Sequence, residues 1–159
     1  DIGPMANVRF AAEVRAQIDE ALAMGARAHI PTFAEDDGGA YLTPQILTNV
    51  SHDMRVMRDE SFGPVVGIMP VKDDAEALAL MNDSPFGLTA SLWTGDVDRA
   101  IRLGDAIQTG TVFLNRADYL DPGLCWTGCK NTGRGGALSE IGYHSLTRPK
   151  SYHLKKVTQ

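Results

Sequence analysis

The sequence predicts an α/β fold, an open and mainly parallel sheet with flanking helices. Three apolar segments, residues 65–71, 88–93 and 111–115, alternate with two helical patterns through short connections, and this order favours right-handed crossovers between parallel strands. The first segment is an almost continuous apolar run, which is typical of strands buried on both faces. With 159 residues, 43% of them hydrophobic, the chain can bury the core of one domain, and no internal domain boundary is apparent.

The first element is expected to be an amphipathic helix. Apolar residues recur at three- and four-residue steps over residues 8–24, with Asn7 as the N-cap and Gly25 at the end. A short strand is expected at residues 27–30.

The next segment is expected to be irregular and then extended. Residues 33–39 are acidic, end in two glycines and read as a surface loop. Residues 41–50 read as extended, and Pro44 argues against a central strand because proline lacks the amide donor of a ladder.

Two further helices follow residues that suit helix caps. Asp73 with Glu76 three positions later forms a capping-box pattern, and the helix should end before the Asn-Asp-Ser-Pro turn at 82–85. Asp96 should cap the second helix, which Gly110 ends.

The last quarter changes character. Residues 116–136 are rich in Gly and Asp and read as a loop that contains Trp126. A short helix is expected at 138–146. Pro149 precedes a basic, alternating segment at 151–157, which reads as an edge strand that has no obvious partner in this chain.

Composition excludes several classes of function. A net charge of -5 and a pI near 5.3 argue against nucleic acid and anionic membranes as partners, and no stretch is long and apolar enough to cross a bilayer. Cys125 and Cys129 are too few for a disulfide framework or a metal cage, so the default location is the cytoplasm. No metal-ligand spacing is present among the four histidines, which are His29, His52, His144 and His153.

The most informative stretch is the hexapeptide at residues 59–64, Asp-Glu-Ser-Phe-Gly-Pro. If it is extended, Glu60 and Phe62 face the same side. A carboxylate and a flat apolar ring suit a nucleotide sugar and an aromatic base. The alternatives from spacing alone are a solvated acid and a core phenylalanine.

Other motifs carry less information. The Gly-Arg-Gly-Gly run at 133–136 lacks the strand and spacing of a phosphate loop and reads as a glycine turn. Cys125 and Cys129 have no histidine close in sequence that would activate either thiol. Trp126 could line an apolar pocket or pack in the core. Three aspartates form no spaced carboxylate pair on one element: Asp105, Asp118 and Asp121.

Taken in order, the motifs resemble those of the NAD(P)-dependent aldehyde dehydrogenases over nearly the whole chain. The resemblance rests on five stretches: residues 1–4 (Asp-Ile-Gly-Pro), 60–64 (Glu-Ser-Phe-Gly-Pro), 82–91 (Asn-Asp-Ser-Pro-Phe-Gly-Leu-Thr-Ala-Ser), 110–115 (Gly-Thr-Val-Phe-Leu-Asn) and 128–133 (Gly-Cys-Lys-Asn-Thr-Gly).

The resemblance implies roles for individual residues. Glu60 would accept hydrogen bonds from the nicotinamide-side ribose of NAD or NADP, and Phe62 would pack near the nicotinamide ring. Trp126 would lie in the aldehyde pocket, with Leu120 and Leu124 as weaker pocket residues.

The resemblance also implies an architecture for the whole protein. Residues 1–147 would be the C-terminal part of the catalytic domain, and residues 148–159 the strand that the family uses to assemble a homodimer or homotetramer. Residues 124–128 replace the usual P-F-G-G pattern, which leaves the aldehyde undetermined. The choice between NAD and NADP is also open.

Parts of the family's machinery are not in this sequence. The nucleophilic cysteine of a G-Q-x-C segment, the general-base glutamate of an E-L-G-G-like segment and the dinucleotide-binding domain are missing, and Cys125 and Cys129 do not align with the nucleophile. The family's thiolate attacks the aldehyde, hydride passes to the nicotinamide, and water hydrolyses the thioester. We therefore expect this chain alone to be inactive. The alternative is a stand-alone, non-enzymatic α/β module that pairs through its C-terminal edge strand.

Overall fold

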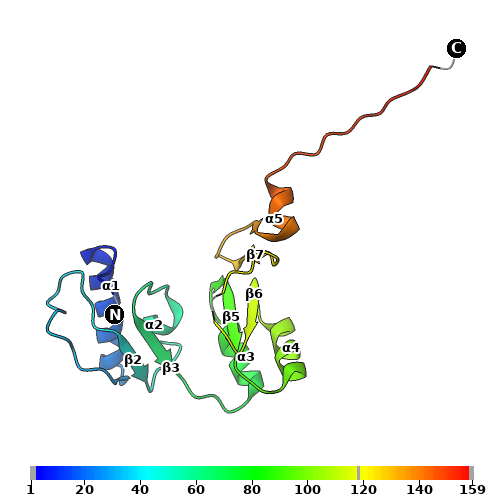
Figure 1. Cartoon of the computed structure of the whole chain (residues 1–159). Helices are drawn as coiled ribbons and strands as arrows, with labels where there is room; N and C mark the ends of the chain where they lie inside the picture. The colour runs from blue at the N-terminus through cyan, green and yellow to red at the C-terminus, as the bar shows by residue number, and fades with distance from the viewer. Residues whose placement is uncertain (1–2, 118, 158–159) are drawn as a thin grey trace. The chain divides into compact units, whose positions relative to one another are not determined.

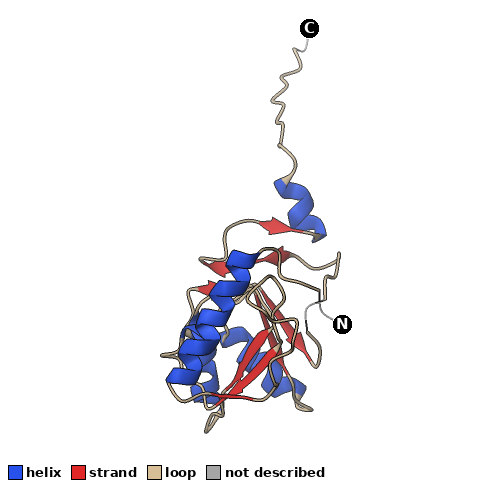
Figure 2. Ribbon diagram, turned by 90° about the vertical axis from the view of Figure 1, so that its left-hand side faces the viewer, coloured by secondary structure: helices blue, strands red, loops and turns tan. Residues whose placement is uncertain are grey.

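The computed structural model describes residues 3–117 and 119–157. The chain divides into two compact units, residues 1–80 and 81–159, and each is described by itself. Helices and short strands occur in both units (Figure 1, Figure 2), which confirms the α/β class. Predictions that involve residues 1, 2, 118, 158 and 159 lie outside the described residues.

The first unit begins with helix α1 (Val8–Ala23), as the apolar spacing predicted. The Asn7 side chain accepts a hydrogen bond of 3.0 Å from the Phe10 N–H, which confirms the N-cap. The chain leaves the helix through Gly25, whose φ of +102° favours glycine. One face of the helix is buried, and its members are Ala11, Val14, Gln17, Ile18 and Ala21.

A three-stranded mixed sheet accompanies α1. Its strands are β1 (Arg27–Ala28), β2 (Gln45–Thr48) and β3 (Val65–Ile68), in that spatial order. β2 pairs antiparallel with β1 and parallel with β3. The short helix α2 (Arg55–Arg58) lies between β2 and β3 in the sequence.

The position of β2 corrects a prediction. Pro44 was expected to exclude a central strand, yet β2 is the middle strand of this sheet. The proline lies one residue before the strand, and the first ladder donor is the Gln45 N–H, which bonds the Pro64 carbonyl at 2.8 Å. A proline immediately before a strand removes no ladder bond.

The core of the first unit lies between α1, α2 and the sheet, and its cluster of buried side chains comprises Ala21, Leu47, Val50 and Met54. β3 was expected to be buried on both faces, but Val66 and Ile68 are 52% and 53% exposed. The strand therefore alternates, because no layer among the described residues covers its second face.

Helix α3 (Asp74–Asn82) spans the sequence boundary between the two units. Its start agrees with the predicted capping pattern: the Asp73 carboxylate accepts the Glu76 N–H at 2.8 Å, and the Glu76 carboxylate accepts the Lys72 N–H at 2.7 Å.

The second unit contains the predicted β-α-β sequence. Strands β5 (Thr89–Leu92) and β6 (Thr111–Leu114) pair in parallel, and helix α4 (Val97–Ala106) connects them. The Asp96 carboxylate accepts the Arg99 N–H at 2.8 Å, which confirms that cap. β3 and β5 belong to different sheets, so the three predicted parallel strands do not form one sheet.

The segment predicted as a loop at 116–136 contains short strands. β4 (Phe86–Gly87) pairs with β8 (Cys129–Lys130), and β7 (Trp126–Thr127) pairs with β9 (Gly136–Ala137), both antiparallel. Helix α5 (Ser139–Ser145) follows. Sequence periodicity missed these strands because two residues are too few to alternate.

The edge strand predicted at residues 151–157 stays a prediction, because it was expected to have no partner in this chain. Residues 147–157 have no regular secondary structure, and Figure 1 shows this part of the chain leaving α5 with no strand beside it. An edge strand exists only when a neighbour supplies the ladder, and the described residues supply none.

Candidate functional site

The hexapeptide at residues 59–64, here called the 59–64 loop, joins α2 to β3 and rests on α1. The Ser61 hydroxyl donates a hydrogen bond of 2.6 Å to the Gln17 side-chain oxygen. Gln17 is only 1% exposed. Gly63 packs so closely on the same helix that a Cβ there would lie 2.9 Å from a methyl carbon of Val14. The loop is therefore held on its inner side by a helix that is distant in sequence.

Glu60 and Phe62 flank Ser61 and are both exposed. The Phe62 side chain is 86% exposed, so the core alternative does not hold for the described residues. The φ of Phe62 is +50°, so the loop is not extended and the expected same-side alternation does not apply.

These two side chains are free to contact a ligand. Within residues 3–117 and 119–157, Glu60 makes no hydrogen bond or ion pair. A carboxylate can accept hydrogen bonds from two hydroxyl groups, and an exposed aromatic ring offers a face for stacking. The loop thus presents a carboxylate and an aromatic ring to solvent, two positions apart in the sequence.

A second candidate site lies beside β6. A cavity of about 180 Å³ is bordered by the whole of β6 and by side chains from residues 116–126, including Leu124 and Trp126. The structure therefore brings two of the three predicted pocket residues together. Leu120 is not among the lining residues and is 58% exposed. Trp126 was expected on irregular backbone, but it belongs to β7.

Two stretches of the family resemblance meet in the same unit and serve its structure. The Lys130 ammonium donates hydrogen bonds of 2.8 and 3.0 Å to the carbonyls of Asn82 and Ser84. The Thr132 hydroxyl accepts the Gly87 N–H at 2.8 Å. These contacts, together with the β4–β8 pairing, hold residues 129–132, which follow the residues that border the cavity.

The two cysteines differ in place. Both thiols are free and half-buried. Cys125 borders the cavity, and its sulfur would lie 2.7 Å from a Cβ on Gly136. Cys129 belongs to β8. In the nearby 133–136 run, Gly133 and Gly135 have φ values of +124° and +97°, as a glycine turn requires.

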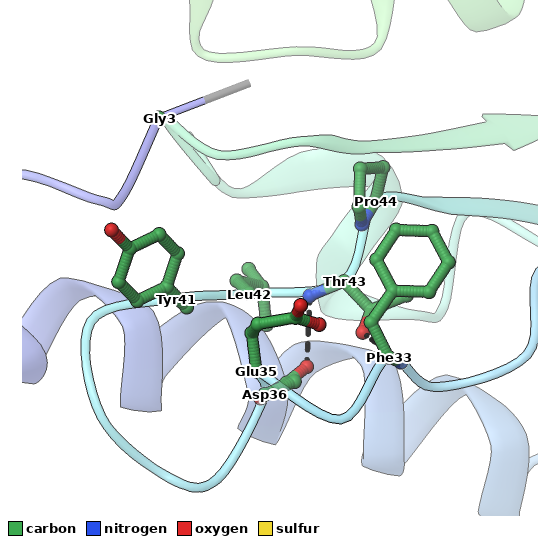
Figure 3. A pocket seen from close by; sticks show the side chains of 8 residues that line it. All are labelled: Gly3, Phe33, Glu35, Asp36, Tyr41, Leu42, Thr43 and Pro44. Carbon is green, nitrogen blue, oxygen red and sulfur yellow. Dashed lines mark hydrogen bonds between the residues drawn. The ribbon is translucent and has the colours of Figure 1, made fainter. Parts of the chain in front are cut away.

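A larger hollow of about 460 Å³ lies over residues 33–44 in the first unit, and sequence reasoning missed it. Figure 3 shows Tyr41 and Phe33 on either side of the Glu35 carboxylate, and the Asp36 carboxylate bonded to the Thr43 N–H. The sequence did hold a signal for this hollow: the acidic loop at residues 33–39 follows a helix that carries Arg15, with which one of its carboxylates could pair.

The floor of this hollow is held by an ion pair. The Arg15 guanidinium lies 2.6 Å from Asp36 and also donates to the Gly39 carbonyl at 2.9 Å. Burial raises the pKa of the Asp36 carboxyl, but the hydrogen bond from the Thr43 N–H and the Arg15 charge outweigh it, so the pKa lies below its usual value. α1 therefore anchors this loop as well.

Other kinds of site find no support in the part of the chain that the structure describes. No cluster of three or more His, Cys, Asp or Glu side chains there could hold a metal ion. None of the described helices combines the length and apolarity needed to cross a membrane.

Comparison with known proteins identifies relatives over almost the entire chain. The model of the aldehyde dehydrogenase family matches residues 1–152. A 3,6-anhydro-alpha-L-galactose dehydrogenase of Streptomyces coelicolor is 35% identical over 158 residues, which are 97% of this chain and 32% of that protein. The NAD(P)+ succinate semialdehyde dehydrogenase of Escherichia coli is 37% identical over 91% of this chain and 31% of its own length.

Solved structures of the same family have a similar fold. The succinic semialdehyde dehydrogenase of Streptococcus pyogenes, solved in complex with NADP+, superposes with a TM-score of 0.87 at 29% identity, over 98% of this chain and 34% of that one. The chain therefore spans about a third of the length of these relatives.

Proposed function

The chain belongs to the aldehyde dehydrogenase family, and from this premise we propose that it forms the C-terminal part of an enzyme that oxidises an aldehyde to a carboxylic acid with NAD or NADP. Residues 1–147 would belong to the catalytic domain, and residues 148–159 would serve assembly. The family match over residues 1–152 carries this proposal. A cytoplasmic location stays a prediction from the sequence.

In this proposal the 59–64 loop binds the cofactor. Glu60 accepts hydrogen bonds from the hydroxyls of the nicotinamide-side ribose, and Phe62 packs near the nicotinamide ring. The exposure of both side chains and the support of the loop by α1 favour these roles. The bound nicotinamide would supply the hydride acceptor, and the chain's contribution would be to fix the orientation of the ring.

The cavity beside β6 is proposed to receive the aldehyde. Leu124 and Trp126 border it, and an apolar lining with a few polar groups is typical of small-molecule sites. Leu120 remains a weaker proposal because it stands outside the lining. The nucleophilic thiol and the general base are proposed to come from residues outside this sequence, because neither family motif occurs in it.

The C-terminal segment is proposed to pair with a second copy, in a homodimer or homotetramer. Residues 151–157 alternate in type, and within the part of the chain that the structure describes they pair with no strand. An extended segment of this kind can add to the edge of another sheet. Removing residues 151–159 from the intact protein should shift sedimentation toward smaller species. An unchanged assembly would contradict this role.

Glu60→Gln in the intact enzyme tests the cofactor role. The amide keeps the shape but loses the charge, which is worth about 1.5–3 kcal/mol for hydrogen bonds to a charged group. We expect single-turnover hydride transfer to slow by about tenfold or more, with little change in aldehyde affinity. Glu35→Gln is the matched control, since Glu35 is also exposed. Unchanged rates and cofactor affinity in Glu60→Gln would remove the assignment.

A second test uses this 159-residue chain by itself. It should not reduce NAD or NADP with any aldehyde, because without a nucleophile no thioester can form. Cofactor reduction that scales with protein concentration and disappears in Cys125→Ser or Cys129→Ser would overturn the view that neither cysteine is the nucleophile.

A further inference from the structure

Gln17 is an unusual residue for its place. It lies on the buried face of α1, where its neighbours on that face are apolar, and only 1% of it is exposed. Burying an amide is unfavourable unless it is hydrogen-bonded. Its side-chain oxygen accepts the hydroxyl of Ser61 at 2.6 Å, so this polar group in the core serves the 59–64 loop.

Ser61 lies between the two proposed cofactor contacts. We propose that Gln17 is a positioning residue of the enzyme: through Ser61 it fixes the backbone that presents Glu60 and Phe62 to the nicotinamide nucleoside. This inference rests on the proposed function of the loop and goes beyond it, because Gln17 itself touches no cofactor.

The loop needs such support because its backbone is strained. Phe62 has a φ of +50°, a region that non-glycine residues seldom adopt unless their surroundings hold them there. The Ser61–Gln17 hydrogen bond holds the residue before Phe62. After it, Gly63 lies against Val14 and Met5 with no room for a Cβ.

The loop is fixed beyond Gly63 as well. The Val65 N–H bonds the Gly63 carbonyl at 2.8 Å, and the Gln45 N–H bonds the Pro64 carbonyl at 2.8 Å. Its C-terminal side is therefore tied to the sheet by backbone bonds. On the side of Glu60, the Asp59 N–H bonds the Arg55 carbonyl at 2.8 Å at the end of α2, and the tie that reaches across to α1 is the bond from Ser61 to the buried Gln17.

Loss of that tie should act on the cofactor and not on the aldehyde. When Ser61 is released, Phe62 can leave its left-handed conformation and Glu60 moves with it. Small displacements of positioning groups slow enzyme reactions strongly. We expect about a tenfold weaker binding of NAD or NADP and slower hydride transfer, while the KM for the aldehyde stays within about twofold.

The experiment uses the intact enzyme and two pairs of variants. Gln17→Leu removes the acceptor and is matched by Gln45→Leu, since Gln45 is 7% exposed and its amide donates to the Ile30 carbonyl instead. Ser61→Val removes the hydroxyl and is matched by Ser61→Thr, which keeps it. Cofactor affinity, aldehyde KM, single-turnover rate and melting temperature are measured for each.

The proposal expects a specific pattern. Gln17→Leu and Ser61→Val weaken cofactor binding, Gln45→Leu and Ser61→Thr do not, and Gln17→Leu adds nothing further to Ser61→Val. Two outcomes would overturn the proposal. One is an equal loss of melting temperature in Gln17→Leu and Gln45→Leu with no change in cofactor binding. The other is additive weakening of cofactor binding when Gln17→Leu and Ser61→Val are combined. If Gln17→Leu does not fold, the comparison of Ser61→Val with Ser61→Thr decides.

Glu60→Gln in the same panel separates this inference from its premise. If Glu60→Gln leaves cofactor binding unchanged, the proposed cofactor role of the loop is wrong. If Glu60→Gln weakens binding while Gln17→Leu and Ser61→Val do not, the cofactor role stands and the positioning role of Gln17 is wrong.

Discussion

The 59–64 loop and the segment at residues 116–137, here called the pocket segment, carry the two sets of proposed contacts and are held in different ways. The loop has one side-chain tie to a buried residue of a helix, the 2.6 Å bond from Ser61 to Gln17, besides the backbone bond of Pro64 to β2. The pocket segment is held by strand pairing, in which Trp126 faces Ala137, and by hydrogen bonds from Lys130 to two backbone carbonyls. The loop should therefore respond to single side-chain changes, and the pocket segment to changes that push its backbone apart.

The units beneath these two regions differ as well. The first unit has a cluster of buried side chains that includes Leu47 and Met54. In the described part of the second unit, the buried apolar side chains are Ala100, Ile107 and Phe113. The loop can use a core as its support, whereas the pocket segment depends more on close approaches of backbone.

The largest effect is expected when the core under the loop is cut. Leu47 is 0% exposed, and Leu47→Ala should cost about 4 kcal/mol because a cavity remains. Hydrogen exchange of the β2 amides in the 159-residue chain should speed up accordingly. Val66→Ala on β3, where the side chain is 52% exposed, should change the free energy of unfolding by less than about 0.5 kcal/mol. Equal effects would break the comparison.

The next effect tests the backbone contact under the pocket segment. A Cβ on Gly110 would lie 1.7 Å from the Thr127 carbonyl oxygen, so Gly110→Ala must force β6 and β7 apart. Overpacking of this kind costs about 3 kcal/mol. Faster exchange of the β6 amides would report it. Gly95→Ala is the control, because a Cβ there meets no atom within 4 Å. Similar exchange in both variants would show that no such contact supports the segment.

Local signals in the sequence predicted the helices well. Asn7, Asp73 and Asp96 were identified as caps, and each accepts the expected N–H. Caps depend on residues three positions apart, so they can be recognised without knowledge of the rest of the fold.

Features that depend on partners were not predictable in the same way. The central place of β2, the exposed face of β3 and the two-residue strands around Trp126 are decided by chain that is distant in sequence. The edge strand predicted at 151–157 also depends on a partner, which was not expected within this chain, so it stays a prediction. Strand propensity is a property of one segment, whereas strand pairing and burial depend on a second segment that lies elsewhere in the sequence.

The candidate sites show the same division. Spacing and resemblance pointed to Glu60 and Phe62, and the structure shows both exposed. The support by Gln17 was missed, although a signal existed: a polar residue three positions after Val14 and four before Ala21, on the apolar stripe of the helix. The positive φ of Phe62 had no signal, because phenylalanine does not favour it.

A third prediction sharpens the comparison, because α1 also holds the 33–44 loop, there by charge. The pKa of Asp36 lies below its usual value, so its contribution is complete above the unfolded pKa of about 3.9 and is lost as the pH falls through the lower folded pKa. Asp36→Asn should cost about 2 kcal/mol at pH 7.

The measurement is denaturation of the 159-residue chain at several pH values. The difference between wild type and Asp36→Asn should shrink below about pH 4, because the wild-type carboxyl then becomes protonated. Glu35→Gln is the control, an exposed acid next in sequence, and should show little difference at any pH. A difference for Asp36→Asn that persists at pH 2 would mean that packing, and not the Arg15 charge, holds this loop.

The smallest effect concerns the lining of the cavity beside β6. Trp126 borders that cavity and is half-buried, whereas Leu120 is 58% exposed and does not border it. In the intact enzyme, Trp126→Ala should raise the KM of an apolar aldehyde by about fivefold to tenfold, in the range of one lost apolar contact. It should leave cofactor affinity unchanged, since the proposed cofactor contacts lie on the 59–64 loop. Leu120→Ala should change neither constant beyond about twofold. A larger effect of Leu120→Ala than of Trp126→Ala on the aldehyde KM would mean that the cavity beside β6 is not the aldehyde pocket as it stands in this chain. Residues outside this sequence would then have to reshape the pocket segment in the whole enzyme.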